Sequence, residues 1–266
     1  MNYKQLLIDN FAFKTSYVAQ FVPGMSIKET KDYIAVDCGL PADTFNIITL
    51  LNNNLTEGVE KLYKEVEYYN QKKFPMSVWL WDEEQGRDIK SELNKIGLKE
   101  AEQNIAMVAD LKTISPTIHM PISFTIQQAS SPGLIKKFGE TLANLFGTSE
   151  EAIHVQAFYK QISNLDLWNS ENMKLFLGFY EGEIVTVGSL ICSKDSIGIY
   201  DIATKEEMRG RGFGSTMFNF LLQEAQKFKN TYCVLQASTD GINIYKKSGF
   251  QAIGKMTVLE NRHVIE

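Results

Sequence analysis

The sequence predicts an α/β fold, and three observations lead to this prediction. Between residues 199 and 250, a strand-like segment, a glycine-rich turn and a helix-patterned segment follow one another. Strand and helix patterns alternate through the rest of the chain. The 266 residues, of which 44% are hydrophobic and 22% charged, are enough for two modest domains with their own cores. We therefore expect two α/β domains.

The first 111 residues carry the signals of one such domain. In chain order we expect a helix over 1–20, strands over 31–40 and 43–51, a helix over 57–73, a strand over 76–81, a helix over 85–96 and a strand over 104–111. Pro75 limits the second helix, because the residue before a proline disfavours helical backbone. Gly97 closes the third helix.

Residues 112–122 separate this domain from the next. Pro116 and Pro121 lie there in a polar run, and proline restricts the backbone outside helix and sheet. We therefore predict one domain over 1–116 and a second over 121–266. The second begins with a strand over 122–128, helices over 134–146 and 150–162, a hairpin over 173–180 and 183–192, and a strand over 198–204.

The run from Met208 to Ser215 is the centre of the second domain. It reads Met-Arg-Gly-Arg-Gly-Phe-Gly-Ser and precedes a helix-patterned segment. Its three glycines allow positive φ and close approach of a ligand, and the first N–H groups of a helix lack intrahelical acceptors. With the helix dipole and with Arg209 and Arg211 beside them, these donors fit a phosphate or pyrophosphate.

The spacing excludes two common phosphate-binding turns. The Walker turn requires Gly-Lys followed by Ser or Thr, and the dinucleotide fingerprint requires two residues between its second and third glycines. Single residues separate the glycines of this chain. Glycine spacing alone therefore leaves the ligand open.

A second motif makes a family resemblance specific. After a strand expected over 232–237, the chain reads Ile-Tyr-Lys-Lys-Ser-Gly-Phe over 244–250. Residues 209–214 resemble the Gln/Arg-x-x-Gly-x-Gly/Ala signature of the GCN5-related N-acetyltransferase (GNAT) superfamily, and residues 244–250 resemble its Leu-Tyr-x-Lys-x-Gly-Phe signature. The resemblance covers about residues 121–266. It implies the acyl-CoA N-acyltransferase fold, a mixed and mostly antiparallel central sheet flanked by helices.

The resemblance also implies acetyl-CoA as co-substrate. Its pyrophosphate is expected on the amides of the turn, and its pantetheine arm beside the preceding strand, where the family's fourth and fifth strands splay apart. Ser238 and Gly241 replace the family's usual asparagine and alanine, and serine still offers a donor and an acceptor. The expected cofactor-binding residues are Ile202, Ala203, Thr204, Arg209, Gly210, Arg211, Gly212, Phe213, Gly214, Ser215, Ser238 and Asn243.

Tyr245 and Asp201 are the predicted catalytic residues. In the family, a tyrosine at this place of the second signature lies near the sulfur and acts as general acid or hydrogen-bond donor, so the resemblance implies this role for Tyr245. Packing of the last helix is the alternative role. Asp201, on the strand before the turn, is our candidate for the base, whereas Glu206 and Glu207 are interpreted as solvated. A backbone N–H of that strand is expected to stabilise the oxyanion.

The N-terminal domain shows a related order of elements without an arginine-glycine turn. For comparison we take residues 82–86, whose sequence Asp-Glu-Glu-Gln-Gly would repel a pyrophosphate. Two interpretations stay open. The domain is either a degenerate GNAT-like domain that binds no cofactor, giving two related domains in tandem, or an unrelated α/β domain. Its expected role is to shape the acceptor site or brace the fold.

The main functional prediction is an acetyl-CoA-dependent N-acetyltransferase that acts on a primary amine of a small molecule or a protein. One alternative is a longer-chain acyl-CoA N-acyltransferase of amino acids, which pocket length beyond the thioester would distinguish. The other is a non-catalytic CoA-binding sensor or interaction module, which would bind acetyl-CoA without turnover. The sequence does not identify the acceptor.

Composition limits the partners. A net charge of −5 argues against a broad nucleic-acid surface, and no apolar run predicts a membrane span or signal peptide. Cys38, Cys192 and Cys233 are widely spaced among apolar residues, and the three histidines are isolated, so we expect neither disulfides nor a metal site. We expect a cytoplasmic protein, either a monomer or a homodimer.

Overall fold

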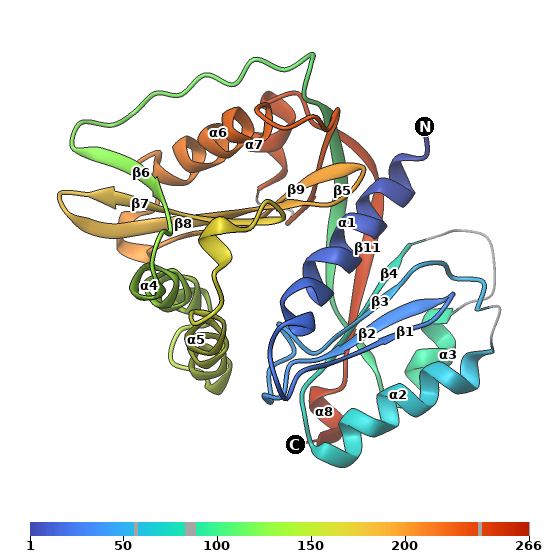
Figure 1. Ribbon diagram of the computed structural model, residues 1–266. Coiled ribbons are helices and arrows are strands. Elements are labelled where there is room, and N and C mark those ends of the chain that lie inside the picture. The colour runs from blue at the N-terminus through green and yellow to red at the C-terminus, as the bar shows by residue number, and fades with distance from the viewer. Residues whose placement is uncertain (56–57, 83–88, 239–240, 266) are drawn as a thin grey trace. The chain divides into compact units, whose positions relative to one another are not determined.

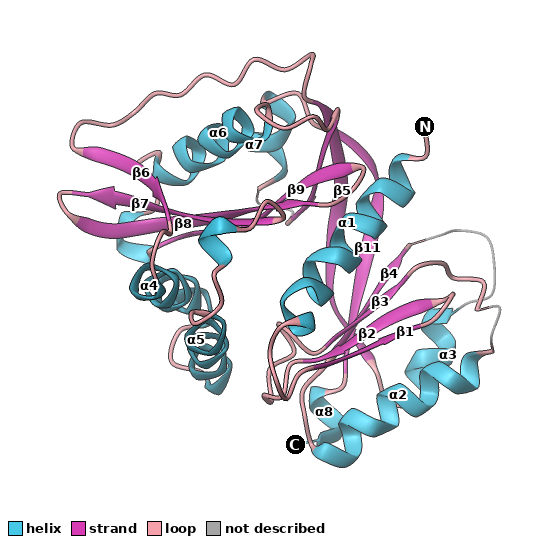
Figure 2. Cartoon of the chain, in the orientation of Figure 1, coloured by secondary structure: helices cyan, strands magenta, loops and turns pink. Residues whose placement is uncertain are grey.

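The computed structural model describes residues 1–55, 58–82, 89–238 and 241–265. Contacts divide the chain into two compact units, one of residues 1–106 with 253–266 and one of residues 107–252. Strands in both units are covered by helices, as Figures 1 and 2 show. The predicted class, a mixed α/β fold with a mostly antiparallel sheet flanked by helices, is confirmed.

The N-terminal unit is built on antiparallel strands followed by one parallel strand. β1, β2 and β3 are antiparallel neighbours, β3 and β4 are parallel, and β4 and β11 are antiparallel. Its elements are α1 (Tyr3–Tyr17), η1 (Val18–Gln20), β1 (Ser26–Glu29), β2 (Tyr33–Asp37), β3 (Ile47–Leu50), α2 (Val59–Lys72), β4 (Ser77–Trp81), α3 (Ile89–Lys95), most of β5 (Lys99–Asp110), β11 (Gln251–Glu260) and α8 (Arg262–Ile265).

The C-terminal unit repeats this pattern with longer strands. β6, β7, β8 and β9 are successive antiparallel neighbours, and β10 runs parallel to β9. α6 and α7 lie on one face of these strands, and α4 and α5 on the other (Figure 1). Its elements are β6 (Phe124–Gln128), α4 (Pro132–Ala143), η2 (Asn144–Phe146), α5 (Glu150–Ile162), η3 (Leu167–Asn169), β7 (Met173–Tyr180), β8 (Glu183–Cys192), β9 (Ser196–Thr204), η4 (Glu206–Met208), α6 (Phe213–Ala225), β10 (Tyr232–Ala237) and α7 (Ile242–Lys247).

The two units share one order of elements and pairings. In each, three antiparallel strands lead into a helix, then into a strand parallel to the third, then into a short helix. The counterpart of the glycine turn is therefore the segment 51–58, between β3 and α2. Our comparison with residues 82–86 was made at the wrong turn, because those residues follow β4. Residues 83–88 also lie outside the described part of the chain.

The last strand makes its contacts in the N-terminal unit. β11 pairs with β4 over residues 256–260, and the buried Asn261 follows it. The Asn261 side chain accepts from the Met76 N–H (2.8 Å) and donates to the Phe74 carbonyl (3.1 Å). Residues 253–266, which we assigned to the C-terminal domain, are thus grouped by contacts with residues 1–106.

The N-terminal core forms between α2, α3 and the strands they cover. α2 presents Val59, Leu62, Val66 and Tyr69 at spacings of three or four residues, which places all four on one face. They pack in one cluster with buried residues of β2, β3 and β4 and with Leu259 of β11. The apolar periodicity of α2 therefore determines which face of the helix covers the sheet.

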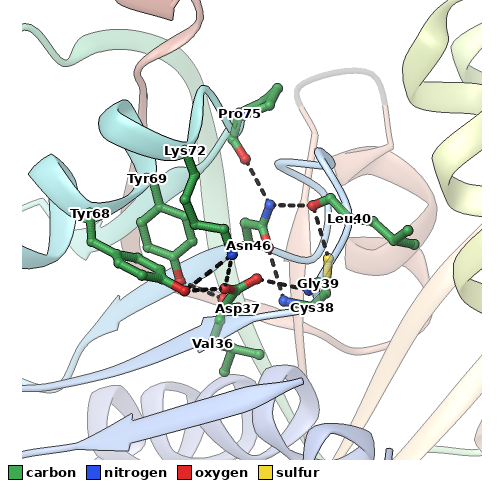
Figure 3. A network of polar contacts seen from close by, with 10 residues as sticks. All are labelled: Val36, Asp37, Cys38, Gly39, Leu40, Asn46, Tyr68, Tyr69, Lys72 and Pro75. Carbon is green, nitrogen blue, oxygen red and sulfur yellow. Dashed lines mark hydrogen bonds and ion pairs between the residues drawn. The ribbon is translucent and has the colours of Figure 1, made fainter. Parts of the chain in front are cut away.

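Asp37, at the end of β2, is the centre of a polar network that ties α2 to the sheet (Figure 3). Its Oδ2 accepts hydrogen bonds from Lys72 Nζ and from the Tyr68 hydroxyl, both at 2.6 Å, and its Oδ1 accepts from the Gly39 N–H at 2.8 Å. Burial acts to raise the pKa of Asp37, but these hydrogen bonds and the charge of Lys72 outweigh burial and lower that pKa below its ordinary value.

We expect Asp37→Asn to reduce the free energy of unfolding at pH 7 by about 1–3 kcal/mol, because a buried charged hydrogen bond is lost. The folded-state pKa of Asp37 lies below its unfolded value, so the carboxylate's contribution is complete above the unfolded pKa, about 4, and is lost as pH falls through the folded value. Urea unfolding should therefore show a difference between variant and wild type that shrinks from about pH 5 to pH 2.

The control for this comparison is Asp195→Asn, a change at an exposed aspartate, which should alter the unfolding free energy by less than about 0.5 kcal/mol. A difference between Asp37→Asn and wild type that stays constant down to pH 2 would contradict the role given to the Asp37 carboxylate.

Candidate active site

The parallel pair β9 and β10 separates within the C-terminal unit. The two strands pair at three positions, of which the last joins Val234 to Gly198. β9 then continues to Thr204 and β10 to Ala237 with no further pairs recorded between them in the described part of the chain. Backbone groups of the separated strands can pair with an extended, amide-containing ligand. The splay that the family resemblance implies is therefore present.

A β-bulge lies on β9 just beyond this point. Val187 is opposite Ala203 and Ser189 is opposite Tyr200, so two residues of β9 face the single residue Gly188. A Cβ at Gly188 would lie 2.8 Å from Cδ1 of a leucine on α6. Glycine at this position therefore allows α6 to pack closely over the bulge.

The two bulged residues have different surroundings. Asp201 has φ +55°, a left-handed conformation that is uncommon outside glycine, although aspartate adopts it more readily than most residues. Its Oδ2 accepts a hydrogen bond from Ser189 Oγ at 2.8 Å. Ile202 instead lines the cavity described below. The bulge thus separates a half-buried carboxylate from the wall of the cavity.

The glycine turn and α6 form an anion-binding arrangement. Gly210 and Gly212 have φ values of +74° and +86°, and a Cβ on either residue would meet no other atom within 4 Å. Gly212 is the N-cap of α6, and its carbonyl accepts the first helical hydrogen bond, from the Thr216 N–H at 2.9 Å. The N–H groups of residues 213–215 precede that bond and have no acceptor within the helix. They point positive charge toward the turn.

Both arginines of the turn are held by side-chain contacts. Arg209 Nε donates to the Thr204 carbonyl at 3.3 Å. The Arg211 guanidinium carbon lies 4.7 Å from the ring centroid of Tyr180 and 5.3 Å from that of Phe213. Such contacts contribute about 0.5–1 kcal/mol at exposed sites. Open space over the glycines, helical N–H groups and two positioned arginines together fit a pyrophosphate.

A cavity of about 370 Å³ extends from the turn to Tyr245. Nine of its lining residues are among those predicted from the sequence, and the cavity brings them together: Ile202, Thr204, Arg209, Gly210, Gly212, Phe213, Gly214, Ser215 and Tyr245. Three were missed: Met208, Phe218 and Ile244. Their signals were present, because Phe218 belongs to the apolar face of α6 and the other two adjoin predicted residues.

The other predicted residues do not line this cavity. Ala203 is buried, and its carbonyl accepts a hydrogen bond from Thr186 Oγ1 at 2.8 Å. Ser238 is exposed after β10, and its Oγ accepts from the Gly241 N–H at 3.3 Å. Asn243 is exposed on α7. Arg211 and Asp201 lie beside the turn and the bulge as described above.

Tyr245 is half-buried and lines the same cavity as the turn. Its ring contacts that of Phe218 edge to face, with centroids 4.8 Å apart, and Phe250 lies behind it at 6.4 Å. Burial raises the pKa of Tyr245, so its hydroxyl is a proton-bearing donor at neutral pH. A Cβ on Gly241 would lie 3.1 Å from Tyr245 Cε2, a close contact that the glycine avoids.

Glu206 and Glu207 lie away from the cavity, on the short helix η4. Both are exposed and line a separate hollow of about 760 Å³, together with Lys137 and Lys205. This position agrees with their interpretation as solvated residues rather than as bases.

The sequence predicted no disulfide, no metal site and no membrane span, and the structure bears on these points only for the residues that it describes. There none of the three cysteines belongs to a disulfide, all three are buried, and burial raises the pKa of Cys192 to about 12. Within the described ranges, no three His, Cys, Asp or Glu side chains group closely enough to hold a metal ion. None of the helices described has the length and apolar character needed to cross a bilayer.

The described residues of the matching turn in the N-terminal unit differ from this arrangement. Gly58 is the N-cap of α2, with φ +91°, and a Cβ there would lie 2.7 Å from Oε2 of Glu60. A carboxylate thus occupies the start of the helix and would repel a pyrophosphate. β3 and β4 also stay paired as far as Thr49 and Trp79, one residue before β3 ends. This unit therefore has no counterpart of the opened strand edge among its described residues.

Comparisons with known proteins agree with this geometry. The model of the acetyltransferase (GNAT) domain family matches residues 145–263. None of the curated proteins matches the chain. Among solved structures, a GCN5-related N-acetyltransferase from Kribbella flavida has a TM-score of 0.67 at 11% identity, covering 94% of each chain. A functionally unknown conserved protein from Staphylococcus epidermidis has a TM-score of 0.64 at 14% identity, covering 90% of this chain and 94% of its own.

The similarity extends to a protein with two GNAT domains in one chain. A tandem GNAT protein from the clavulanic acid biosynthesis pathway has a TM-score of 0.61 at 10% identity, and the match covers 97% of this chain and 94% of that one. Its full-length match agrees with the repeated order of elements in the two units. At these identities the structural matches establish the fold, and the family match together with the fold supports an acyl-CoA N-acyltransferase activity. The match to the acetyltransferase (GNAT) domain family thus covers the part of the chain that holds the glycine turn, α6 and Tyr245.

Proposed function

We propose that the C-terminal unit transfers the acetyl group of acetyl-CoA to a primary amine of a small molecule or of a protein. The observation that carries the proposal is the cavity of about 370 Å³, whose lining includes both the residues of the anion-binding turn and Tyr245. The acetyl group as donor is carried over from the name of the matching family.

The residues of the turn would hold the diphosphate of the coenzyme. The N–H groups of residues 213–215 and the charges of Arg209 and Arg211 supply donors and positive potential for it. The separated edge of β9 offers backbone groups to the amides of the pantetheine arm. Bound there, acetyl-CoA supplies an activated thioester, and these residues orient it along the cavity toward Tyr245.

Two side chains would carry the proton transfers. Tyr245, protonated at neutral pH, donates a proton or hydrogen bond to the departing sulfur. Asp201 receives the proton of the attacking amine, directly or through water, from its place at the bulge.

A screen of primary amines with acetyl-CoA, read by release of free thiol, tests this function. We expect acceptor-dependent release with at least one class of amine and a faster reaction with acetyl-CoA than with longer acyl-CoAs. Preference for a longer acyl-CoA would overturn the acetyl donor. Tight binding of acetyl-CoA without release across the panel would indicate a sensor.

Ser215→Asp tests the anion site at the start of α6. The added carboxylate occupies the first turn of the helix, so we expect binding of CoA to weaken at least tenfold by isothermal titration calorimetry. The helix itself should not be destabilised, because an acidic residue is favourable in its first turn. Ser215→Ala is the control and should bind CoA within about threefold of wild type, since the amides of the turn remain.

The same titration reports stoichiometry. The N-terminal turn carries Glu60 where an anion would bind, so we expect one CoA per chain in the wild-type protein. A second CoA that still binds to Ser215→Asp would contradict the assignment of a single site.

Tyr245→Phe removes the proposed proton donor and little else. We expect kcat to fall about tenfold or more, with the KM for acetyl-CoA nearly unchanged, because the phenyl ring keeps its contact with Phe218. Because burial raises the Tyr245 pKa, wild-type kcat should show no loss from ionisation of this residue up to about pH 10. Equal kcat values for variant and wild type would remove Tyr245 from the mechanism.

A further inference from the structure

Asp201 occupies the most unusual backbone position in the C-terminal sheet. It is a non-glycine residue at φ +55° inside a strand, and it belongs to the pair of β9 residues that face Gly188. Strained backbone of this kind persists only where the surrounding structure stabilises it. Contacts of the Asp201 side chain therefore help to maintain the bulge.

One such contact is a hydrogen bond to the Asp201 side chain from Ser189. Ser189 lies on β8 next to the bulge, and its side chain is fully buried, with no exposed surface. Its neighbours along β8, Val187 and Leu190, are buried and apolar. A buried hydroxyl destabilises the fold unless it is hydrogen-bonded. Ser189 meets this requirement by donating to Asp201 Oδ2 at 2.8 Å.

Two tyrosines that feel the negative charge of Asp201 stay neutral at neutral pH. Tyr159 on α5 and Tyr200 on β9 are both buried, and burial, with a smaller contribution from the negative charge of Asp201, raises the pKa of each well above its ordinary value. These two phenols, which feel the charge of Asp201, are therefore neutral at neutral pH.

We propose that Ser189 is a positioning residue, which orients the Asp201 carboxylate at the bulge so that it can receive the proton of the acceptor amine. This inference rests on the proposed function and extends it by one residue. Ser189 touches neither the cavity nor the turn. Its hydroxyl holds one oxygen of the Asp201 carboxylate by a hydrogen bond. This bond fixes the orientation of the carboxylate relative to the separated strands β9 and β10.

A double-mutant cycle tests the inference in the full-length chain. Ser189→Ala, Asp201→Asn and the double variant are compared with wild type, using acetyl-CoA and an amine from the screen. We expect Ser189→Ala to lower kcat about tenfold with the KM for acetyl-CoA within about twofold, because one hydrogen bond to a charged group is lost. In the Asp201→Asn background, the same serine change should cause no further loss.

Ser196→Ala is the matched control, since Ser196 is also a buried serine of this sheet but lies at the start of β9. It should keep wild-type kcat, and circular dichroism melts should show that all the variants fold. Equal losses from Ser189→Ala in both backgrounds would show a general packing effect and overturn the inference. The inference would also be overturned if Asp201→Asn lowers kcat while Ser189→Ala keeps the wild-type kcat. That result would leave the proposed function intact. A wild-type chain that acetylates no amine would overturn both.

Discussion

The C-terminal unit depends on the separation of β9 from β10 after Gly198 and Val234. If the two parallel strands stayed paired to their ends, the backbone of β9 would be saturated and no ligand could align with it. Beyond that point, six further residues of β9 have no pairing with β10 in the described part of the chain, and the bulge gives two of them different surroundings. One strand thereby supplies a ligand edge, a carboxylate and, at its end, the approach to the anion-binding turn.

The N-terminal unit shows what the same topology becomes without that separation. Its third strand is short and is paired almost to its end, and its first helix after the strands starts with Glu60 where the C-terminal unit has open amides. The N-terminal unit is instead stabilised by its apolar core and by the hydrogen-bond network around Asp37. Shared topology thus provides the scaffold, and local differences at one turn and one strand pair decide whether a site can form.

Local signals in the sequence were sufficient for much of this structure. The predicted ranges 150–162, 173–180, 183–192 and 232–237 coincide with α5, β7, β8 and β10, because each has clear periodicity and a turn at its end. The glycine turn and Tyr245 were found from motifs. The bulge at Asp201 and the pairing of β11 with β4 were not predicted, since register and long-range pairing depend on contacts far apart in the chain. The short, mostly exposed β1 was also missed. Without β1 in the count of strands, we compared the glycine turn with residues 82–86 rather than with the segment 51–58.

Hydrogen–deuterium exchange with and without coenzyme A tests most directly whether the first amides of α6 hold the coenzyme's diphosphate. The account predicts that saturating coenzyme A slows exchange strongly in a peptide covering residues 210–216 and in β9 beyond Gly198. Exchange in the peptide that contains Gly58 and Glu60 should stay unchanged. Binding of coenzyme A with unchanged exchange over residues 210–216 would contradict it.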